Sequence, residues 1–310
     1  VATTREVSYE IIVVDNASSD GSADEIARHG SRPRLIALTE NVGFGRGNNI
    51  AADKAEGRYL LLLNPDTVVL DGAIDRLVEF ARQKPEARIW GGRTTFADGT
   101  LNPSSAWARM TTWRLACRAT GLAAIAPRSS LLNGEAMGAW KRDTVREVDI
   151  VSGCFFLVTK RLWRRLGGFD PLFFMYGEEA DFCLRAHALG ASPAITPAAT
   201  IIHYGGASEA TREGKMVKLL AAKATLIDRH FHRVLRPIGL AFHAAWPLSR
   251  WLALSALAAI TRSPSLDERA RVWRRIWNRR NEWRRGWQPN AEASGMLKLG
   301  PSPQSVQTPV

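Results

Sequence analysis

The chain has 310 residues, 45% of them hydrophobic, which is enough for a sizeable core and excludes a disordered protein. Its formal net charge is +12, and residues 231–290 carry +9 of this through twelve arginines, no lysine and three acids. Three widely spaced cysteines without a CxxC pattern exclude a zinc or disulfide framework and indicate reduced thiols in the cytosol.

The first part of the chain alternates strand-like and helix-like segments. Its start has no apolar stretch long enough for a signal peptide, so we expect the protein to stay on the cytosolic side. Strands are predicted over Glu10–Asp15, Arg34–Leu38 and Tyr59–Leu63, and helices over Ser22–His29, Asn48–Ala55 and Asp71–Arg82. Apolar strands that alternate with helices indicate an α/β fold with a parallel sheet covered on both faces.

Two aspartates follow strands of this predicted sheet. Asp15 ends the first strand, and Asp66 follows the third within Asn64-Pro65-Asp66. Each could be an ordinary turn or helix-cap aspartate. Functional groups of such sheets collect at the carboxyl ends of strands, and two acids at equivalent ends favour a shared crevice.

A long irregular segment follows, over residues 97–147, with a short helix predicted around Thr111–Ala119. Long loops in compact domains are usually functional or mobile. Beyond it we predict a strand pair or one long strand over Val148–Thr159, a helix over Lys160–Leu166 and a tight turn at Gly167–Pro171.

An acidic stretch comes next, directly after the bulky residues 173–176. Glu178, Glu179 and Asp181 fall in the first turn of a predicted helix that runs to Leu189, where the helix dipole favours anions. A catalytic base and a capped helix start are both possible interpretations. Residues 193–202 are predicted to be extended up to His203, whose place before two glycines keeps a metal-binding role open beside a structural one.

Six motifs in this order resemble the family 2 glycosyltransferases, and above all their bacterial rhamnosyltransferase-like branch. The motifs are Val14–Ser22, Asn41–Phe44, Asn64–Asp66, Gly167–Asp170, Tyr176–Asp181 and His203. The resemblance implies a nucleotide-binding sheet of the glycosyltransferase A type, flanked by helices, in a catalytic domain over residues 1–230. It also implies an inverting sugar transfer.

The resemblance further implies a role for each site residue. The nucleotide-sugar site would consist of Asp15, Asn16, Asn48, Asn64 and Asp66. Asp66 and His203 would hold Mg²⁺ or Mn²⁺ at the donor diphosphate, whose leaving charge a divalent cation stabilises. Glu179 is the expected base for the acceptor proton, with Glu178 as the second candidate, and Asp181 is expected as a helix cap or a partner of Arg185.

The sequence departs from the family pattern in two places. Relatives commonly have Glu-Asp where this chain has Glu178-Glu179, so the aligned base is one methylene longer. The family's first strand and helix normally precede Asp15 and line the nucleotide site, and residues 1–9 leave too little room for them. We therefore expect either a fragment or a misassigned start.

The C-terminal part, residues 231–290, is expected to be helical, basic and membrane-associated. Residues 238–260 are apolar but contain Arg250, which favours a helix in the membrane interface over one that spans the bilayer. If residues 271–287 form one helix, a tryptophan-rich arc faces several arginines, which suits an anionic membrane surface. The alternative is that this arc packs on the catalytic domain. Nucleic acid is not an expected partner, because no nucleic-acid-binding motif accompanies the arginines. Residues 291–310 are predicted to be disordered.

The predicted function is a glycosyltransferase in cell-surface glycan synthesis. It would move a sugar, with rhamnose as the guess from the resemblance, from a nucleoside diphosphate donor to a lipid-linked or polysaccharide acceptor. We expect it in the cytoplasm, peripheral on the inner face of the cytoplasmic membrane. The alternative is a non-catalytic nucleotide-sugar-binding or membrane scaffold protein.

Overall fold

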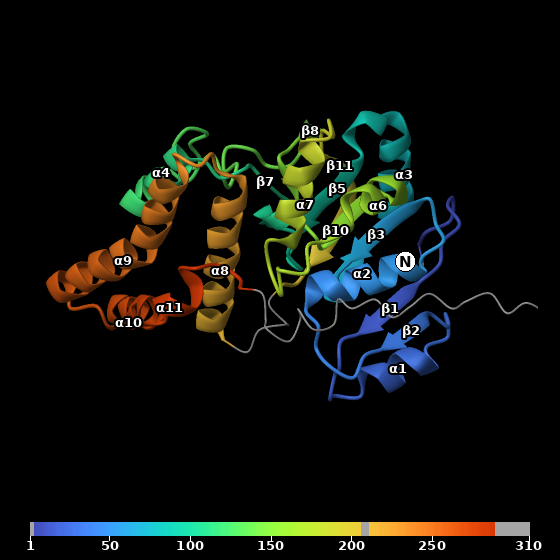
Figure 1. Cartoon of the computed structure of the whole chain (residues 1–310), viewed down its shortest axis with the longest axis horizontal. Helices are drawn as coiled ribbons and strands as arrows, with labels where there is room; N and C mark the ends of the chain where they lie inside the picture. The colour runs from blue at the N-terminus through green and yellow to red at the C-terminus, as the bar shows by residue number, and fades with distance from the viewer. Residues whose placement is uncertain (1–2, 206–210, 289–310) are drawn as a thin grey trace, which may run out of the picture.

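The computed structural model describes residues 3–205 and 211–288 and shows an α/β fold with a helical C-terminal part (Figure 1). The strands are β1 Ile12–Asp15, β2 Arg34–Ala37, β3 Tyr59–Leu63, β4 Thr67–Val69, β5 Ile89–Thr95, β6 Leu101–Asn102, β7 Ala106–Trp107, β8 Arg146–Glu147, β9 Ile150–Val151, β10 Phe155–Thr159 and β11 Ala194–His203. The helices are α1 Ser22–Arg28, α2 Phe44–Lys54, α3 Ala73–Gln83, α4 Thr112–Thr120, α5 Leu122–Ile125, α6 Lys160–Leu166, α7 Glu178–His187, α8 Arg212–His230, α9 Arg236–Thr261, α10 Pro264–Asn278 and α11 Arg280–Trp283. The predicted tail 291–310 lies outside the described residues.

The expectation of one parallel sheet is wrong for most of the strands. β1 and β2 pair in parallel as a sheet of their own. The large sheet has the order β3-β10-β5-β11-β4, and only β5 and β11 run parallel in that path. Central strands of a mixed sheet are buried on both faces as well, so their apolar pattern carries no information about direction.

The large sheet packs against helices on both faces, and β10 shows why. Its residues alternate between two cores: Phe155 and Leu157 join the cluster under α3, whereas Phe156 and Val158 join the cluster under α6 and α7. In the second cluster four aromatic rings lie with their centroids 4.8–6.2 Å apart, namely Phe156, Trp163, Phe169 and Phe182. This aromatic core fixes the start of α7, where the acidic stretch lies.

The C-terminal tryptophans pack inward. Two helices, α10 and α11, replace the single predicted helix, because the chain leaves helical geometry at Arg279. Trp283 is 0% exposed and packs with Val217 and Leu220 of α8, and Trp273 lies 5.5 Å from the ring of Trp246 in α9. The tryptophan-rich arc therefore covers α8 and α9, as in the alternative to a membrane-facing arc.

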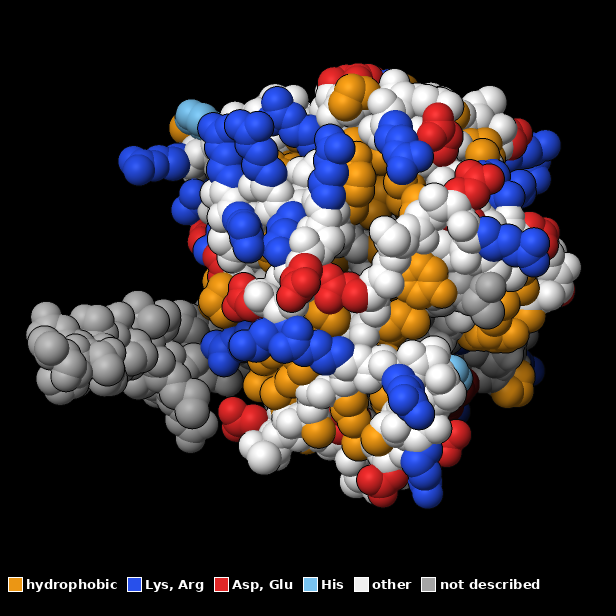
Figure 2. Space-filling model, turned by 90° about the vertical axis from the view of Figure 1, so that its right-hand side faces the viewer, with side chains coloured by type: hydrophobic (Ala, Val, Ile, Leu, Met, Phe, Trp, Pro, Cys, Tyr) orange, Lys and Arg blue, Asp and Glu red, His pale blue; other side chains and the backbone are white. Residues whose placement is uncertain are grey.

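One face of the molecule carries mixed charge. Figure 2 shows the side of the molecule with β1, β2 and α3, where Lys and Arg side chains lie among Asp and Glu, with hydrophobic side chains between them. Within residues 3–205 and 211–288, no helix is both long enough and apolar enough to cross a membrane.

Candidate active site

The pairing of β4 with β11 brings Asp66 and His203 together. His203 lies opposite Thr67 in this antiparallel pair, and the Tyr204 N–H donates to the Asp66 carbonyl at 3.0 Å. His203 Nε2 consequently lies 3.3 Å from Asp66 Oδ1, and both side chains are about one-seventh exposed, at 14% and 15%. The two predicted metal ligands are therefore neighbours that are 137 positions apart in the sequence.

Two buried polar atoms at this place have no protein partner. Both His203 Nδ1 and Asn64 Oδ1 are buried without a hydrogen bond. Asn64 is held by its backbone N–H, which donates to the Cys154 carbonyl at 3.2 Å. Buried polar atoms are normally satisfied, so orphaned ones point to a missing ligand. Among the described residues, however, no group of three or more His, Cys, Asp or Glu side chains could hold a metal alone.

The two glutamates are the first residues of α7. The helix starts directly after Gly177, whose φ of 92° is the left-handed conformation that glycine adopts freely. Glu178 is only 3% exposed. Burial, and then the charge of Glu179, raises the pKa of Glu178 well above that of an ordinary glutamate. Burial also raises the pKa of Glu179, although backbone hydrogen bonds from the helix start oppose this.

The two glutamates face different neighbours. A Cβ added to Gly153 would lie 3.8 Å from the Glu179 Cβ, whereas Glu178 Cβ is next to Gly45 of α2. Burial first, and then the charges of Glu179 and Asp66, raise the pKa of the Cys154 thiol to about 11. The Gly153–Cys154 segment is thus near Glu179 and, through the hydrogen bond from the Asn64 N–H to the Cys154 carbonyl, near the loop that carries Asp66.

Three of the predicted nucleotide-site residues lie at the end of β1, directly after it and in α2, namely Asp15, Asn16 and Asn48. Asp15 is buried, and its Oδ2 accepts from the Ser18 N–H at 3.2 Å. The Asn16 side chain ties the end of β1 to the loop before α2, because it donates to the Gly43 carbonyl at 3.3 Å and accepts from the Val42 N–H at 2.8 Å. Asn48 Nδ2 donates to the Phe44 carbonyl at 2.9 Å within α2. Asn16 and Asn48 thus already have protein partners.

The loop before α2 also contacts the acidic stretch. The Phe44 N–H donates to the Phe174 carbonyl at 3.0 Å. Gly43 has a φ of 83°, and a Cβ there would lie 2.2 Å from the Phe174 oxygen, so only glycine fits. This contact places the nucleoside side and the glutamate side next to each other.

The third acid of the motif, Asp181, is a structural residue. It is 1% exposed and bonds Arg185 Nε at 2.7 Å, as predicted, together with His230 Nε2 at 2.9 Å. Arg229 bridges Asp181, at 3.3 Å, and Asp170, at 2.7 Å. Asp170 and Asp181 thereby fasten α8 to the start of α7, and neither is free for chemistry.

The residues that the sequence did not single out are Gly153 and Cys154, which adjoin Glu179 and the loop at Asn64. They lie in the break between β9 and β10, which the sequence left open as one long strand or a strand pair. The glycine in an otherwise apolar run was the available signal, because such a glycine often marks a close approach of other groups.

Comparison with known proteins places these motifs in a family. A model for glycosyl transferase family 2 matches residues 4–143. The O-antigen biosynthesis protein RfbC of Myxococcus xanthus is 30% identical over 67% of this chain, which spans 16% of that protein. An N-acetylglucosaminyl-diphospho-decaprenol L-rhamnosyltransferase of Mycobacterium tuberculosis (strain ATCC 25618 / H37Rv) is 27% identical over 66% of this chain and 68% of its own length.

A solved structure shares the fold. The mannosyltransferase PcManGT from Pyrobaculum calidifontis, in complex with GDP-Man and Mn²⁺, superposes with a TM-score of 0.54 at 15% identity, over 88% of this chain and 78% of that one. The predicted glycosyltransferase A type of fold is confirmed. Residues 4–143 therefore match glycosyl transferase family 2, and the relatives of this chain include bacterial rhamnosyltransferases.

Proposed function

We propose that this protein catalyses a metal-dependent, inverting transfer of a rhamnose-like sugar from a nucleoside diphosphate to a lipid-linked or polysaccharide acceptor. The observation that carries the proposal is that the Gly153–Cys154 segment adjoins Glu179 and also the loop at Asn64, which carries Asp66 next to His203. A proton acceptor and a diphosphate-binding pair are thus adjacent but separate, as displacement with inversion requires.

The donor side fits a divalent cation. Asp66 offers a carboxylate, His203 an imidazole nitrogen, and His203 Nδ1 and Asn64 Oδ1 are buried polar atoms without partners. Mg²⁺ is commonly bound by one or two carboxylates together with substrate phosphates, so a two-residue set is sufficient. When bound, Mg²⁺ or Mn²⁺ stabilises the negative charge that develops on the departing diphosphate. Asp15, at the end of β1, would hold the nucleoside.

The acceptor side uses Glu179 as general base. Its raised pKa makes the carboxylate a stronger proton acceptor, and the residue is partly exposed, unlike Glu178. Acceptance of the hydroxyl proton by a Glu179 oxygen as the new glycosidic bond forms completes the transfer. Glu178 is buried against α2 and supports the helix start, and burial followed by the charge of Glu179 raises its pKa well above the ordinary value.

Substitution of Asp66 tests the metal dependence. We expect Asp66→Asn to retain the fold and to lose at least about tenfold of kcat/KM, with the loss partly restored by higher Mn²⁺, because the amide keeps one oxygen but no charge. The assay is transfer or hydrolysis of a panel of nucleotide sugars with Mg²⁺, Mn²⁺ or chelator. Turnover by the unaltered chain that is indifferent to chelator would contradict the metal assignment, and no turnover of any donor would contradict the function.

We also propose that the protein is peripheral at the inner face of the cytoplasmic membrane through the outer face of α9. The tryptophan-rich arc packs inward, whereas α9 exposes four apolar side chains, with Ile238 47%, Leu252 55%, Leu257 48% and Ile260 79% exposed. They lie within about 140° on the helix, and Arg236, Arg250 and Arg262 flank them.

Vesicle co-sedimentation tests this proposal. Leu257→Glu with Ile260→Glu should reduce binding to anionic vesicles by tenfold or more, because two carboxylates replace two exposed apolar side chains of this face. The matched control is Tyr9→Glu, which alters an equally exposed side chain, 52%, at the other end of the chain. Equal binding of both variants would contradict the assignment to α9.

A further inference from the structure

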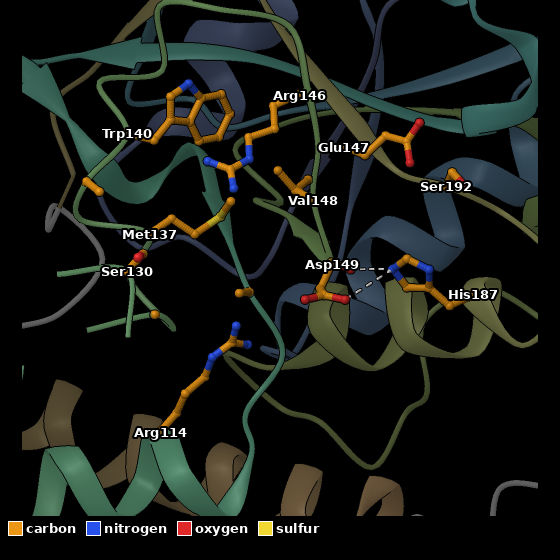
Figure 3. Close-up of a pocket in the computed structure, with 13 residues that line it drawn as sticks. Arg114, Ser130, Met137, Trp140, Arg146, Glu147, Val148, Asp149, His187 and Ser192 are labelled. Atoms are coloured by element: carbon orange, nitrogen blue, oxygen red, sulfur yellow. Dashed lines mark hydrogen bonds and ion pairs between the residues drawn. The ribbon is translucent and has the colours of Figure 1, made fainter. Parts of the chain in front are cut away.

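A cavity of about 420 Å³ lies between the loop over residues 130–149 and the ends of α4 and α7 (Figure 3). The side chains that line it include Arg114, Met137, Trp140, Arg146, Asp149 and His187. His187 ends α7 eight residues after Glu179, which is about 12 Å along the helix axis. None of these residues belongs to the candidate active site.

The cavity has two arginines that no carboxylate neutralises. Figure 3 shows Arg114 and Arg146 pointing into it from opposite sides. Neither forms an ion pair with any described residue. The two carboxylates that line the cavity are already paired: Glu147 accepts from Lys84 Nζ at 2.9 Å, and Asp149 accepts from Arg109 Nε at 2.7 Å and its N–H at 2.9 Å. The cavity therefore carries uncompensated positive charge.

The acid next to His187 remains ionised in this setting. Burial opposes the charge of Asp149, but the hydrogen bonds and charge of Arg109, with a contribution from His187, hold the pKa of Asp149 below its usual value. Its carboxylate is thus occupied by cations of its own. His187 Nε2 lies 3.1 Å from the Asp149 carbonyl oxygen, which fixes the imidazole at the cavity wall.

Arg146 is held in place without use of its donors. Its guanidinium carbon lies 5.2 Å from the centroid of the Trp140 ring, and the guanidinium carbon of the buried Arg142 lies 5.1 Å from the same ring. Arg142 donates to five backbone carbonyls, which fasten the loop that carries Trp140. Stacking orients a guanidinium but leaves its N–H groups free for a planar, two-point contact with phosphate.

Arg114 is likewise preorganised. One of its terminal nitrogens donates to the Arg109 carbonyl at 2.5 Å, and the guanidinium lies against Gly134, where an added Cβ would approach Nε to 3.0 Å. Its remaining N–H groups have no partner among the described residues. Met137 and Val148 give the cavity apolar walls, which strengthen charge-assisted hydrogen bonds inside it.

We propose that this cavity binds a diphosphate group, with one phosphate at Arg114 and the other at Arg146. Two fixed guanidinium groups on opposite walls suit a ligand with two linked anionic centres better than a single carboxylate. The group could belong to a soluble diphosphate or to a lipid-linked one, and both share this chemistry. The site is distinct from the donor diphosphate site at Asp66.

Calorimetry with inorganic diphosphate tests the proposal on the full chain, in chelator so that a metal-dependent site does not contribute. Arg114→Gln and Arg146→Gln should each weaken binding roughly tenfold, since each removes a charge-assisted pair. The matched control Arg161→Gln alters an exposed arginine of α6 and should leave binding unchanged. Thermal melting of every variant checks the fold, and Arg146→Lys should restore only part of the affinity, because a lysine keeps the charge without the planar contact.

Two outcomes overturn the proposal. One is no heat of binding at millimolar diphosphate, and the other is equal affinity in the variant that combines Arg114→Gln with Arg146→Gln and in Arg161→Gln. A second arm identifies the source. Vesicles of phosphatidylcholine with a polyprenyl diphosphate should retain the protein, and free diphosphate should release it, if the ligand is lipid-linked. Binding of free diphosphate without retention on these vesicles assigns a soluble ligand.

Discussion

Glu179→Gln should abolish useful sugar transfer, with a loss of about 10² to 10⁴ in kcat, and should leave donor affinity unchanged. Glutamine keeps the shape and the hydrogen-bonding reach of the side chain but cannot take the acceptor proton. The donor contacts, at Asp66, His203 and Asp15, lie on other elements and are untouched. Rapid-mix turnover gives kcat, and calorimetry with the nucleotide product gives the affinity.

Glu178→Gln is the matched control for this change. Glu178 is nearly fully buried against α2, and burial followed by the charge of Glu179 raises its pKa well above the ordinary value, which favours the neutral acid that an amide mimics. We expect less than a tenfold loss, about 1.4 kcal/mol in activation free energy. Equal mild losses from both substitutions would refute the assignment of the base.

The pH profile follows from the same group. A base must be deprotonated to act, so kcat/KM should rise with pH as Glu179 ionises. Because burial raises the pKa of Glu179, this rise should lie above the usual glutamate value of about 4.3. Glu179→Gln should lose this limb of the profile.

Glu135→Gln should destabilise the protein by about 3 to 5 kcal/mol at neutral pH. Glu135 is buried and pairs with Lys223 of α8 and with Arg118 of α4, the latter at 3.1 Å. Burial opposes its ionisation, but the charges of Arg118 and Lys223 outweigh this and lower the pKa of Glu135 to about 2. Removal of the negative charge leaves both cations without a partner. Urea denaturation, followed by circular dichroism, measures the change in the free energy of unfolding.

Two comparisons isolate this effect. Glu56→Gln removes an exposed acid that has no ion pair among the described residues, and it should change the free energy of unfolding by less than about 0.5 kcal/mol. Glu135→Leu combined with Lys223→Met should recover most of the loss, because apolar residues often replace a buried pair at little cost. If the double variant is as unstable as Glu135→Gln, the buried pair is not the cause.

The same cluster should make the protein acid-sensitive. A carboxyl whose pKa is lowered in the folded state stabilises the fold at every pH above its pKa in the unfolded chain. This stabilisation is lost as the pH falls from about 4.3 toward 2. Nearby His243 is 2% exposed, and burial, followed by the charge of Lys223, lowers its pKa to about 4. The unfolded chain binds a proton at His243 first, so stability also falls as the pH drops from about 6.5 to 4.

Local elements were predictable from sequence because they depend on neighbours in the chain. β3 and α6 have the predicted bounds. β3 is a continuous apolar run, and α6 is confined between the end of β10 and Gly167, so neither element could begin or end at many other residues. α2 begins at Phe44, four residues before the predicted start, because its N-cap is Gly43 and lacks the side-chain signal of an ordinary cap.

Long-range features were not predictable in the same way. Strand direction depends on which strands meet, as with β10 between β3 and β5. The tryptophan-rich arc was recognisable as an apolar stripe. A stripe alone does not show whether protein or lipid covers it, and in the structure α8 and α9 cover it. The pairing of Asp66 with His203 followed from the family resemblance, whereas the arginine cavity depends on a loop without periodicity.

The contact of Gly43 with the Phe174 carbonyl bears on how the enzyme could change its substrate. The Asn16 side-chain amide links the end of β1 to Gly43, and the bond from the Phe44 N–H to the Phe174 carbonyl then leads along the chain to Gly177 at the start of α7. Apart from Asn16, these links are main-chain atoms, so exchange of other side chains around a donor sugar would leave them in place. A designer who wishes to accept a new donor sugar could vary those side chains, provided that Asn16 and these glycines stay.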